Sequence, residues 1–224
     1  MPGPTMAADL LLMLLADARL PVAGHTQSAG LEPAVLGGLT SAGVPLYLGA
    51  RLDTVTRVEA ATAVVALHHL RQAISLEPVT AAWAARTPSQ ALRHVSRTQG
   101  RALHRLLRRL WPEHPAVVAV GGATAPRAVV LAAAADAAGL SPAALARLVG
   151  YDDAQTVAAA ALKLLPMDPA DATGWVLDAL PLIEDLAADV AALTEPGDIP
   201  ASGAPQFEAW AQAHATATRR LFSA

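Results

Sequence analysis

Prolines and glycines divide this sequence into short segments, and nearly every segment between them has helical periodicity. Breaks fall at Pro21, Gly37, Pro112 and Pro166, because proline lacks the N–H that a helix interior needs and glycine favours helix ends. Long alternations of apolar and polar residues, which would indicate strands, are scarce. The pattern predicts an all-α fold, with one helical-bundle-like domain over 1–224 that contains about ten helices.

Local signals place most helix ends. Ser89 and Ser141 stand where cap residues accept a hydrogen bond from the first turn, and Asp168 is followed by a proline that suits a first turn. A loop is predicted at "SAGVPLYLG", 41–49. Helices are expected near 10–18, 31–36, 53–75, 77–86, 89–110, twice within 115–138, and near 141–148, 152–165, 168–193 and 207–220.

Charge is scarce for a chain of this length. Only 16% of the residues are charged, against roughly 25% in an average soluble domain. A helical body with so little charge is expected to have part of its apolar surface covered by a partner or by a second copy. The net charge of -3 argues against general attraction to nucleic acid or anionic membranes. The absence of cysteine excludes disulfide and thiolate chemistry and fits the cytoplasm.

Two apolar stretches imitate membrane signals. "LLLMLL" at 10–15 has no basic residue before it, so it lacks the charged start of a signal peptide. The stretch 116–135 contains Gly121, Pro126 and Arg127 near its middle, where a proline and a cation are unfavourable in a bilayer. Both are better explained as parts of a soluble protein, and no membrane partner is expected.

The segment "LPVAGHTQSAGLE", 20–32, which we call the opening motif, contains none of the common catalytic or metal-binding patterns. Its glycines are not followed by the Lys-Ser or Lys-Thr of a phosphate loop. Ser28 lies in "QSAG", which lacks the complete G-x-S-x-G pattern of a nucleophile elbow. No two histidines have the four-residue spacing of a helical metal site. An enzyme would have to use an unrecognised site around His25 or Ser28, and we expect no catalytic residue, metal or cofactor.

Arginines recur every four residues along the expected helix 89–110. We call these residues the arginine ridge: Arg93, Arg97, Arg101, Arg105 and Arg109. Such a row can face water, pair with acids of the same fold, bind an acidic protein surface, or bind nucleic-acid phosphates. A protein partner is preferred to nucleic acid, because aromatic residues are not interleaved and the net charge is negative. An all-α nucleic-acid-binding regulator that uses Arg93–Arg109 is the alternative. The acids Asp152, Asp153, Asp168 and Asp171 are read as helix N-terminal residues that complement the helix dipole.

Several segments together resemble the UreF family of urease accessory proteins. The opening motif is similar to that family's glycine-rich segment that runs into Gly-Leu-Glu, although His25 and Gln27 stand where the family has aromatic residues. "SRTQGRALHRLL", 96–107, resembles its Ser-Arg…Gly-Arg helix, and "HPAVVAVGGATA", 114–125, its His-Pro-Val segment. "AQTVAAAALKLLPMDP", 154–169, and "HATATRRLFSA", 214–224, resemble its Asn-Gln-Val stretch and its Arg-Leu-Phe tail. The matches follow one order along almost the whole chain.

The resemblance implies an all-α, non-enzymatic scaffold that dimerises, binds UreD (also called UreH) and recruits the GTPase UreG. That assembly would deliver nickel to apo-urease, coupled to GTP hydrolysis by UreG. It also implies a partner-binding role for 207–224, which a linker-like stretch at 194–206 would tether loosely to the body. Nucleic acid and membranes would not be partners.

The candidate partner-binding residues come from the segments that carry the resemblance. They are His25, Gln27, Ser28, Gly30, Glu32, Arg97, Arg101, Gln155, Arg219, Arg220, Leu221 and Phe222. Which of them would meet UreD, UreG or a second protomer is left open.

Overall fold

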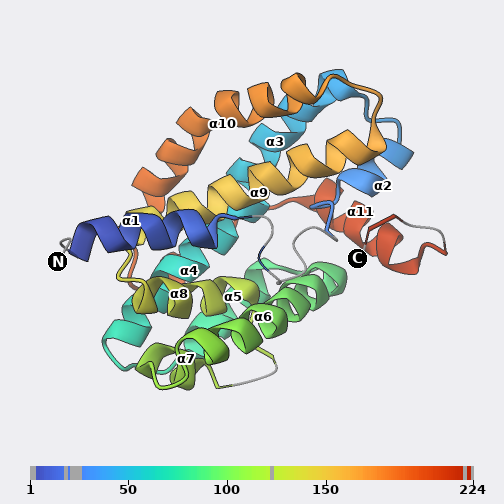
Figure 1. Ribbon diagram of the computed structural model, residues 1–224. Helices are drawn as coiled ribbons and strands as arrows, with labels where there is room; N and C mark the ends of the chain where they lie inside the picture. Colours follow the sequence, from blue (N-terminus) through green and yellow to red (C-terminus); the bar gives the residue numbers. More distant parts are fainter. Residues whose placement is uncertain (1–3, 18–19, 21–26, 122–123, 219–220, 223–224) are drawn as a thin grey trace.

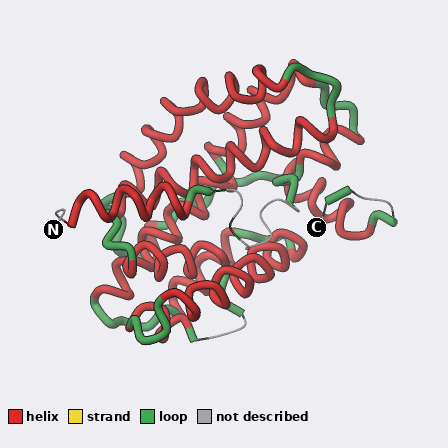
Figure 2. The backbone as a smooth tube through the Cα atoms, viewed as in Figure 1, coloured by secondary structure: helices red, strands yellow, loops and turns green. Residues whose placement is uncertain are grey.

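The all-α prediction is confirmed. The computed structural model describes residues 4–17, 20, 27–121, 124–218 and 221–222, and within these ranges the chain forms helices and turns without any strand (Figure 2). The helices are α1 (Pro4–Leu15), α2 (Leu31–Leu36), η2 (Ser41–Gly43), α3 (Val44–Asp53), α4 (Val55–Arg71), α5 (Glu77–Arg86), α6 (Gln90–Leu110), α7 (Pro115–Val120), α8 (Arg127–Ala137), α9 (Pro142–Leu164), α10 (Pro169–Val190), η3 (Pro196–Asp198) and α11 (Pro205–Thr216). None of these helices has the length and apolar character that a bilayer crossing requires.

The predicted caps are confirmed at three helix starts. The side chain of Ser89 accepts a hydrogen bond from Leu92 N–H, and that of Ser141 accepts one from Ala144 N–H at 3.1 Å. The carboxylate of Asp168 accepts one from Ala170 N–H at 2.8 Å. Each bond satisfies a first-turn N–H that has no partner within its own helix, which is why these ends could be located from sequence.

The centre of the molecule is formed by α4 and α8. Every residue from 60 to 67 in α4 and from 128 to 135 in α8 is buried. A helix that is buried all round must be covered on every side, and α4 is in contact with α3, α5, α8, α9 and α10. Most of these central residues are alanines, so the low-charge composition is used in part for close helix packing.

The remaining helices cover this centre from two sides (Figure 1). In the figure, α3, α9 and α10 lie above α4, with α1 beside α9, and α5, α6 and α7 lie below. The contact between α9 and α10 is close: a Cβ at Gly150 would lie 3.0 Å from Ile183. A small α11 packs against α2 and α6 near the C-terminus.

Several helix boundaries differ from the expectations. The predicted loop 41–49 is wrong, because η2 and the start of α3 occupy it and Pro45 lies in the first turn, where it needs no N–H partner. The two helices expected at 141–148 and 152–165 are one continuous helix, α9. The first helix begins at Pro4, well before the expected start near residue 10.

The stretch 194–206, read as a linker, packs against the body. Arg86 of α5 donates hydrogen bonds to the carbonyl oxygens of Ile199 and Gly197, the latter at 2.9 Å. Ile199 itself is 2% exposed. The last helix ends at Thr216, four residues before the expected end. The prolines and glycines of 194–206 indicate an irregular backbone, and most of this stretch lies outside α-helices. An irregular backbone can still be held in place by side chains of a neighbouring helix, as Arg86 does here.

Candidate functional site

The described part of the opening motif is a tight turn held by α3. Ala29 and Gly30 both have positive φ angles, 51° and 78°. The hydroxyl of Tyr47 donates a hydrogen bond to Ala29 O at 2.7 Å. A Cβ on Gly30 would lie 3.0 Å from that hydroxyl. Glycine is therefore required at position 30 both for its backbone conformation and for the close approach of Tyr47.

Glu32, just after this turn, has a buried carboxylate surrounded by donors from the other end of the chain. Its Oε2 accepts hydrogen bonds from Phe222 N–H and from His214 Nε2, both at 2.9 Å. Its Oε1 accepts one from Leu221 N–H at 2.6 Å. Burial, the largest influence, raises the pKa of Glu32, but the hydrogen bonds from Leu221, Phe222 and His214 outweigh it and lower that pKa below its ordinary value. Glu32 is therefore held as a carboxylate.

Aromatic residues surround the base of α11. Phe207 lies edge-on to Tyr47, with ring centroids 5.0 Å apart, and Trp210 lies 5.9 Å from Tyr47. The Arg51 guanidinium lies 5.6 Å from the Phe207 centroid. Position 27, where the resemblance leads us to expect an aromatic residue, is a glutamine. An aromatic cluster on α3 and α11 packs against the same region instead. α11 (Pro205–Thr216) is packed against the body, which differs from the loose tether expected from sequence.

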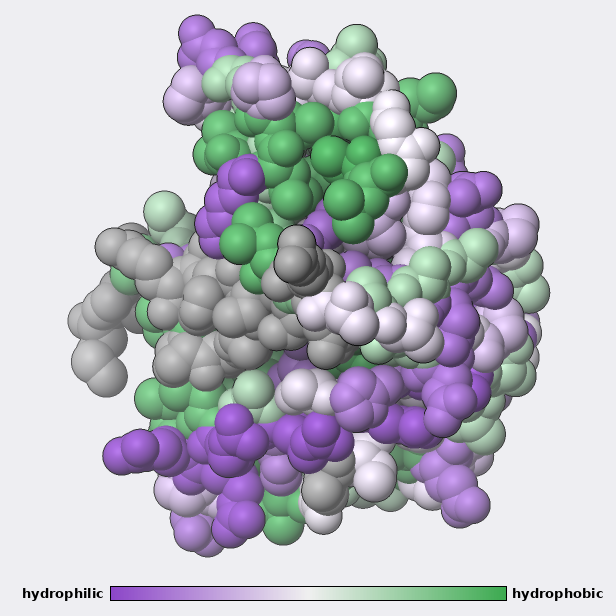
Figure 3. Space-filling view, turned by 90° about the vertical axis from the view of Figure 1, so that its right-hand side faces the viewer, coloured by the Kyte–Doolittle hydropathy of each residue, from purple (hydrophilic) through white to green (hydrophobic). Residues whose placement is uncertain are grey.

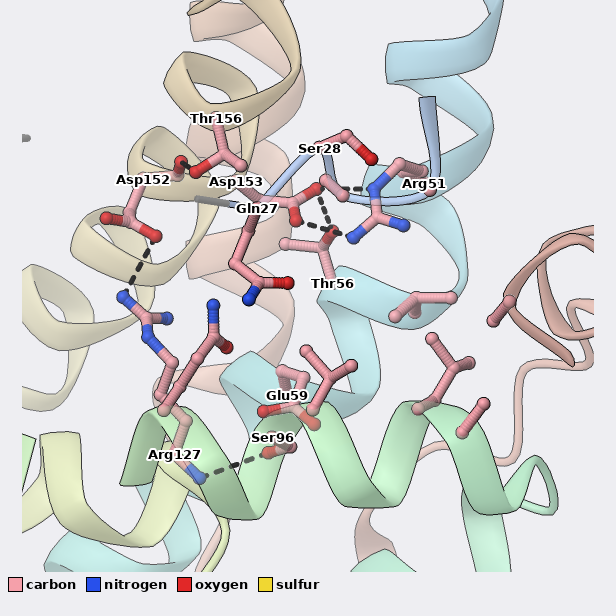
Figure 4. A pocket seen from close by; sticks show the side chains of 18 of the residues that line it. Gln27, Ser28, Arg51, Thr56, Glu59, Ser96, Arg127, Asp152, Asp153 and Thr156 are labelled. Carbon is pink, nitrogen blue, oxygen red and sulfur yellow. Dashed lines mark hydrogen bonds and ion pairs between the residues drawn. The ribbon is translucent and has the colours of Figure 1, made fainter. Parts of the chain in front are cut away.

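A pocket of about 130 Å³ opens beside the opening motif (Figure 4). Gln27 and Ser28 line it on one side, and residues of α2, α3, α4, α6, α8, α9 and α11 complete it. In Figure 4 the Gln27 side chain extends into the space between two ion pairs of the wall. The candidate residues Gln27, Ser28 and Gly30 are therefore brought together at one pocket.

The two ion pairs correct the reading of Asp152 and Asp153 as helix N-terminal residues, because both lie in the middle of α9. Asp153 binds Arg51 of α3, and Asp152 binds Arg127 of α8 with Nη2 to Oδ2 at 2.9 Å. Burial, the largest influence, raises the pKa of Asp153, but the charge and hydrogen bonds of Arg51, with the hydroxyl of Thr56, lower it overall. These acids hold three helices together at the pocket wall.

A further acid faces the pocket from α4. Glu59 Oε1 accepts a hydrogen bond from Trp83 Nε1 at 2.6 Å. Burial raises the pKa of Glu59 above its ordinary value, although the bond from Trp83 and the nearby Arg127 partly oppose this shift. The sequence gives no sign that Glu59 and Arg51 belong to this site, since nothing in their own segments shows which residues of distant helices face them.

The arginine ridge does not form one continuous face. Each step of four residues turns by about 40° around the helix, so the row winds from the body into solvent. Arg93 donates to the carbonyl oxygens of Thr87 and Pro88 just before its own helix, and the Arg97 guanidinium lies 5.6 Å from the Trp83 ring centroid. Arg105 and Arg109 are exposed. The five arginines of the ridge therefore do not present one unbroken row to solvent.

The Ser-Arg…Gly-Arg segment has a packing role. Ser96 Oγ accepts a hydrogen bond from the N–H of Arg127, the first residue of α8, at 3.0 Å. A Cβ on Gly100 would lie 2.4 Å from Ala125 O. Ser96 and Gly100 are one turn apart on α6 and let the start of α8 approach its backbone.

The other candidates lie apart from the pocket. Arg101 donates to Thr98 Oγ1 on its own helix at 2.9 Å, and Gln155 donates to Tyr151 OH at 2.8 Å. His25, Arg219 and Arg220 lie outside the described residues. Among the residues that the structure describes, no cluster of three His, Asp or Glu side chains could hold a metal ion.

Known proteins resemble this chain over nearly all of its length. A family model described as UreF matches residues 40–180. The urease accessory protein UreF of Mycobacterium sp. (strain JLS) is 39% identical over 95% of this chain and 97% of its own length. The protein of that name from Mycolicibacterium vanbaalenii is 38% identical over 97% of this chain and 100% of its own, and the one from Mycobacterium tuberculosis (strain H37Rv) is 33% identical over 97% and 99%.

Proposed function

The chain belongs to the UreF family of urease accessory proteins, and from this premise we propose that it is the scaffold that bridges UreD (UreH) and the GTPase UreG. In this role it supports GTP-dependent insertion of nickel into apo-urease. Proteins of this family assist urease maturation and are not catalysts themselves. We place its action in the cytoplasm, as a homodimer within the accessory complex.

The observation that carries the proposal is the meeting of the two chain ends at Glu32. The opening motif and the terminal tail both resemble the family, and 182 residues separate Glu32 from His214. The hydrogen bonds from His214, Leu221 and Phe222 to Glu32 place the two segments side by side. The contact itself is buried, but it holds Leu221 exposed beside it, and an apolar residue held exposed in this way supports a role in binding.

Exposed apolar residues support binding as well. On the face drawn in Figure 3, hydrophobic side chains gather above a band of hydrophilic ones. In Figure 1, α2 and the end of α9 lie on this side, and Leu36 of α2 is 72% exposed while Leu162 of α9 is 46% exposed. Leu221 on the tail is 63% exposed. Exposed large apolar side chains of this kind, beside a face where hydrophobic residues gather, are typical of a protein that is covered by partners.

The test is capture of co-expressed UreD by the full chain that carries Leu221→Asp. The matched control is Val118→Asp on α7, because Val118 is 61% exposed and Leu221 is 63% exposed. We expect Leu221→Asp to lower the affinity for UreD by roughly tenfold or more, since an apolar side chain central to an interface is replaced by a charge. The control should bind as the unmodified chain does. Equal binding by both variants would contradict the assignment of the tail to the UreD surface.

A further inference from the structure

We propose that Glu32 is an internal receptor for the C-terminal tail, and that its carboxylate fixes the tail in the form that the partner binds. The tail here means residues 214–222, of which 214–218 and 221–222 are described. The partner-binding half of this inference rests on the proposed function. The docking half concerns the chain alone and can be tested without any partner.

The donor set around Glu32 matches an ionised carboxylate. Its two oxygens accept three hydrogen bonds, two from backbone N–H groups and one from an imidazole nitrogen. A carboxylate offers only acceptors. A glutamine at this position would place an NH₂ donor against one of these donors. The site therefore selects glutamate over its neutral isostere, which simple packing of a side chain would not do.

The two backbone bonds come from consecutive residues, and this fixes the direction of their side chains. Leu221 N–H binds one oxygen and Phe222 N–H binds the other. With the backbone held at both points, Phe222 is 4% exposed and lies under Lys163, whose Nζ is 5.2 Å from the ring centroid. Leu221 is held 63% exposed. The clamp thus buries one apolar residue and presents its neighbour.

Release of the tail is expected to be energetically unfavourable, because it breaks the hydrogen bonds to Glu32 and exposes Phe222. The Glu32 side chain is 7% exposed and that of His214 is 5% exposed when docked. Loss of the tail removes both N–H donors and the His214 imidazole from the carboxylate, so three hydrogen bonds to a charged group are lost at once. Phe222 would lose its burial at the same time. Because the hydrogen bonds to Glu32 and the burial of Phe222 are lost together, we expect the tail to be docked or released as a unit. The partner would then meet a tail that is already fixed in place, which lowers the entropy cost of binding.

The first arm of the test is hydrogen exchange at the amides of Leu221 and Phe222 in the full chain. Glu32→Gln is expected to speed exchange at both amides by roughly tenfold or more, since exchange reports local opening. The amides of α4 and α8 should keep their protection. Glu113→Gln, a change at an exposed glutamate between α6 and α7, is the control and should change neither region. Unchanged exchange at Leu221 and Phe222 in Glu32→Gln would overturn the proposal.

A second variant removes a donor instead of the acceptor, and it changes a residue of the tail that lies outside every helix. Leu221→Pro lacks the N–H that reaches Glu32, whereas Leu221→Ala keeps it. Faster exchange at Phe222 in Leu221→Pro but not in Leu221→Ala supports the clamp. Equal exchange in the two variants overturns it, even where Glu32→Gln fails to fold.

The second arm is capture of UreD by the same variants. Weaker capture by Glu32→Gln, together with faster exchange at the tail, supports both halves. Faster exchange with unchanged capture overturns the partner-binding half and leaves the docking half supported. If the unmodified chain captures no UreD while its tail amides behave as expected, the scaffold function fails and the clamp stands.

Discussion

Arg51 of α3 and Asp153 of α9 face each other through two parallel hydrogen bonds, with Nε 2.9 Å from Oδ2 and Nη2 2.6 Å from Oδ1. Thr56 Oγ1 donates a third bond to Oδ2 at 2.8 Å. The two side chains are 7% and 17% exposed. The pair therefore ties two helices together at the wall of the pocket, in a place where neither charge could be solvated well alone.

Asp153→Ala should lower the free energy of unfolding by about 3 kcal/mol, because it leaves the buried guanidinium of Arg51 without its counter-charge. The control is Asp189→Ala, since Asp189 binds Arg57 but is 59% exposed. An exposed pair is worth at most about 1 kcal/mol. Urea denaturation of both variants checks the difference, and equal losses would show that burial does not govern these pairs.

Glu59→Gln is expected to stabilise the protein increasingly as the pH rises. Burial raises the pKa of folded Glu59, so the folded state binds its proton more tightly than the unfolded state does. The protonated Glu59 therefore contributes to the free energy of unfolding. This contribution is complete at low pH and is lost as the pH rises from about 4.5, the ordinary pKa of glutamate, through the raised pKa of folded Glu59. Glutamine keeps an oxygen for Trp83 N–H and carries no charge.

Thermal denaturation of Glu59→Gln and the unmodified chain across this pH range measures that effect. The gap in melting temperature should widen with pH and then level off. A gap that narrows as the pH rises would mean that folded Glu59 prefers to be charged.

Gly100→Ala should cost about 2 kcal/mol of stability, because a Cβ would lie 2.4 Å from Ala125 O and would push α6 away from the start of α8. Gly174→Ala on α10 is the matched control. A Cβ there meets nothing within 4 Å, so alanine should stabilise the helix by about 0.5–1 kcal/mol. Denaturant midpoints of the two variants should move in opposite directions, and a shift in the same direction would refute the close-approach argument.

Arg97→Ala should lower stability by about 1–2 kcal/mol, since the guanidinium lies over the buried Trp83 ring. Arg105→Ala, on the exposed part of the same ridge, should stay within about 0.5 kcal/mol of the unmodified chain. Chemical denaturation monitored by tryptophan fluorescence compares the two. If Arg105→Ala proves as damaging as Arg97→Ala, the inner and outer parts of the ridge do not differ as the structure indicates.

Features that depend on a few neighbouring residues were predictable. The caps at Ser89, Ser141 and Asp168 were located correctly, because each accepts an N–H only two or three residues further along the chain. The segment at 41–49 was misread, since Ser41, Gly43 and Pro45 favour turns and helix starts alike. The prediction for Asp153 is wrong for a similar reason. Two consecutive aspartates after Gly150 resemble the start of a helix, but α9 continues through them.

The sequence alone determined the helical class, most helix boundaries and the family resemblance, because helix caps, proline positions and apolar periodicity act over a few residues. Only the tertiary structure decided that Glu32 holds the far end of the chain, that Arg51 pairs with Asp153, and that the arginine ridge divides into a partly buried and an exposed part. These depend on which side chains the packed helices bring within bonding distance. Nothing in the residues around Glu32 indicates that its hydrogen-bond donors come from Leu221 and Phe222, about 190 residues further along the chain.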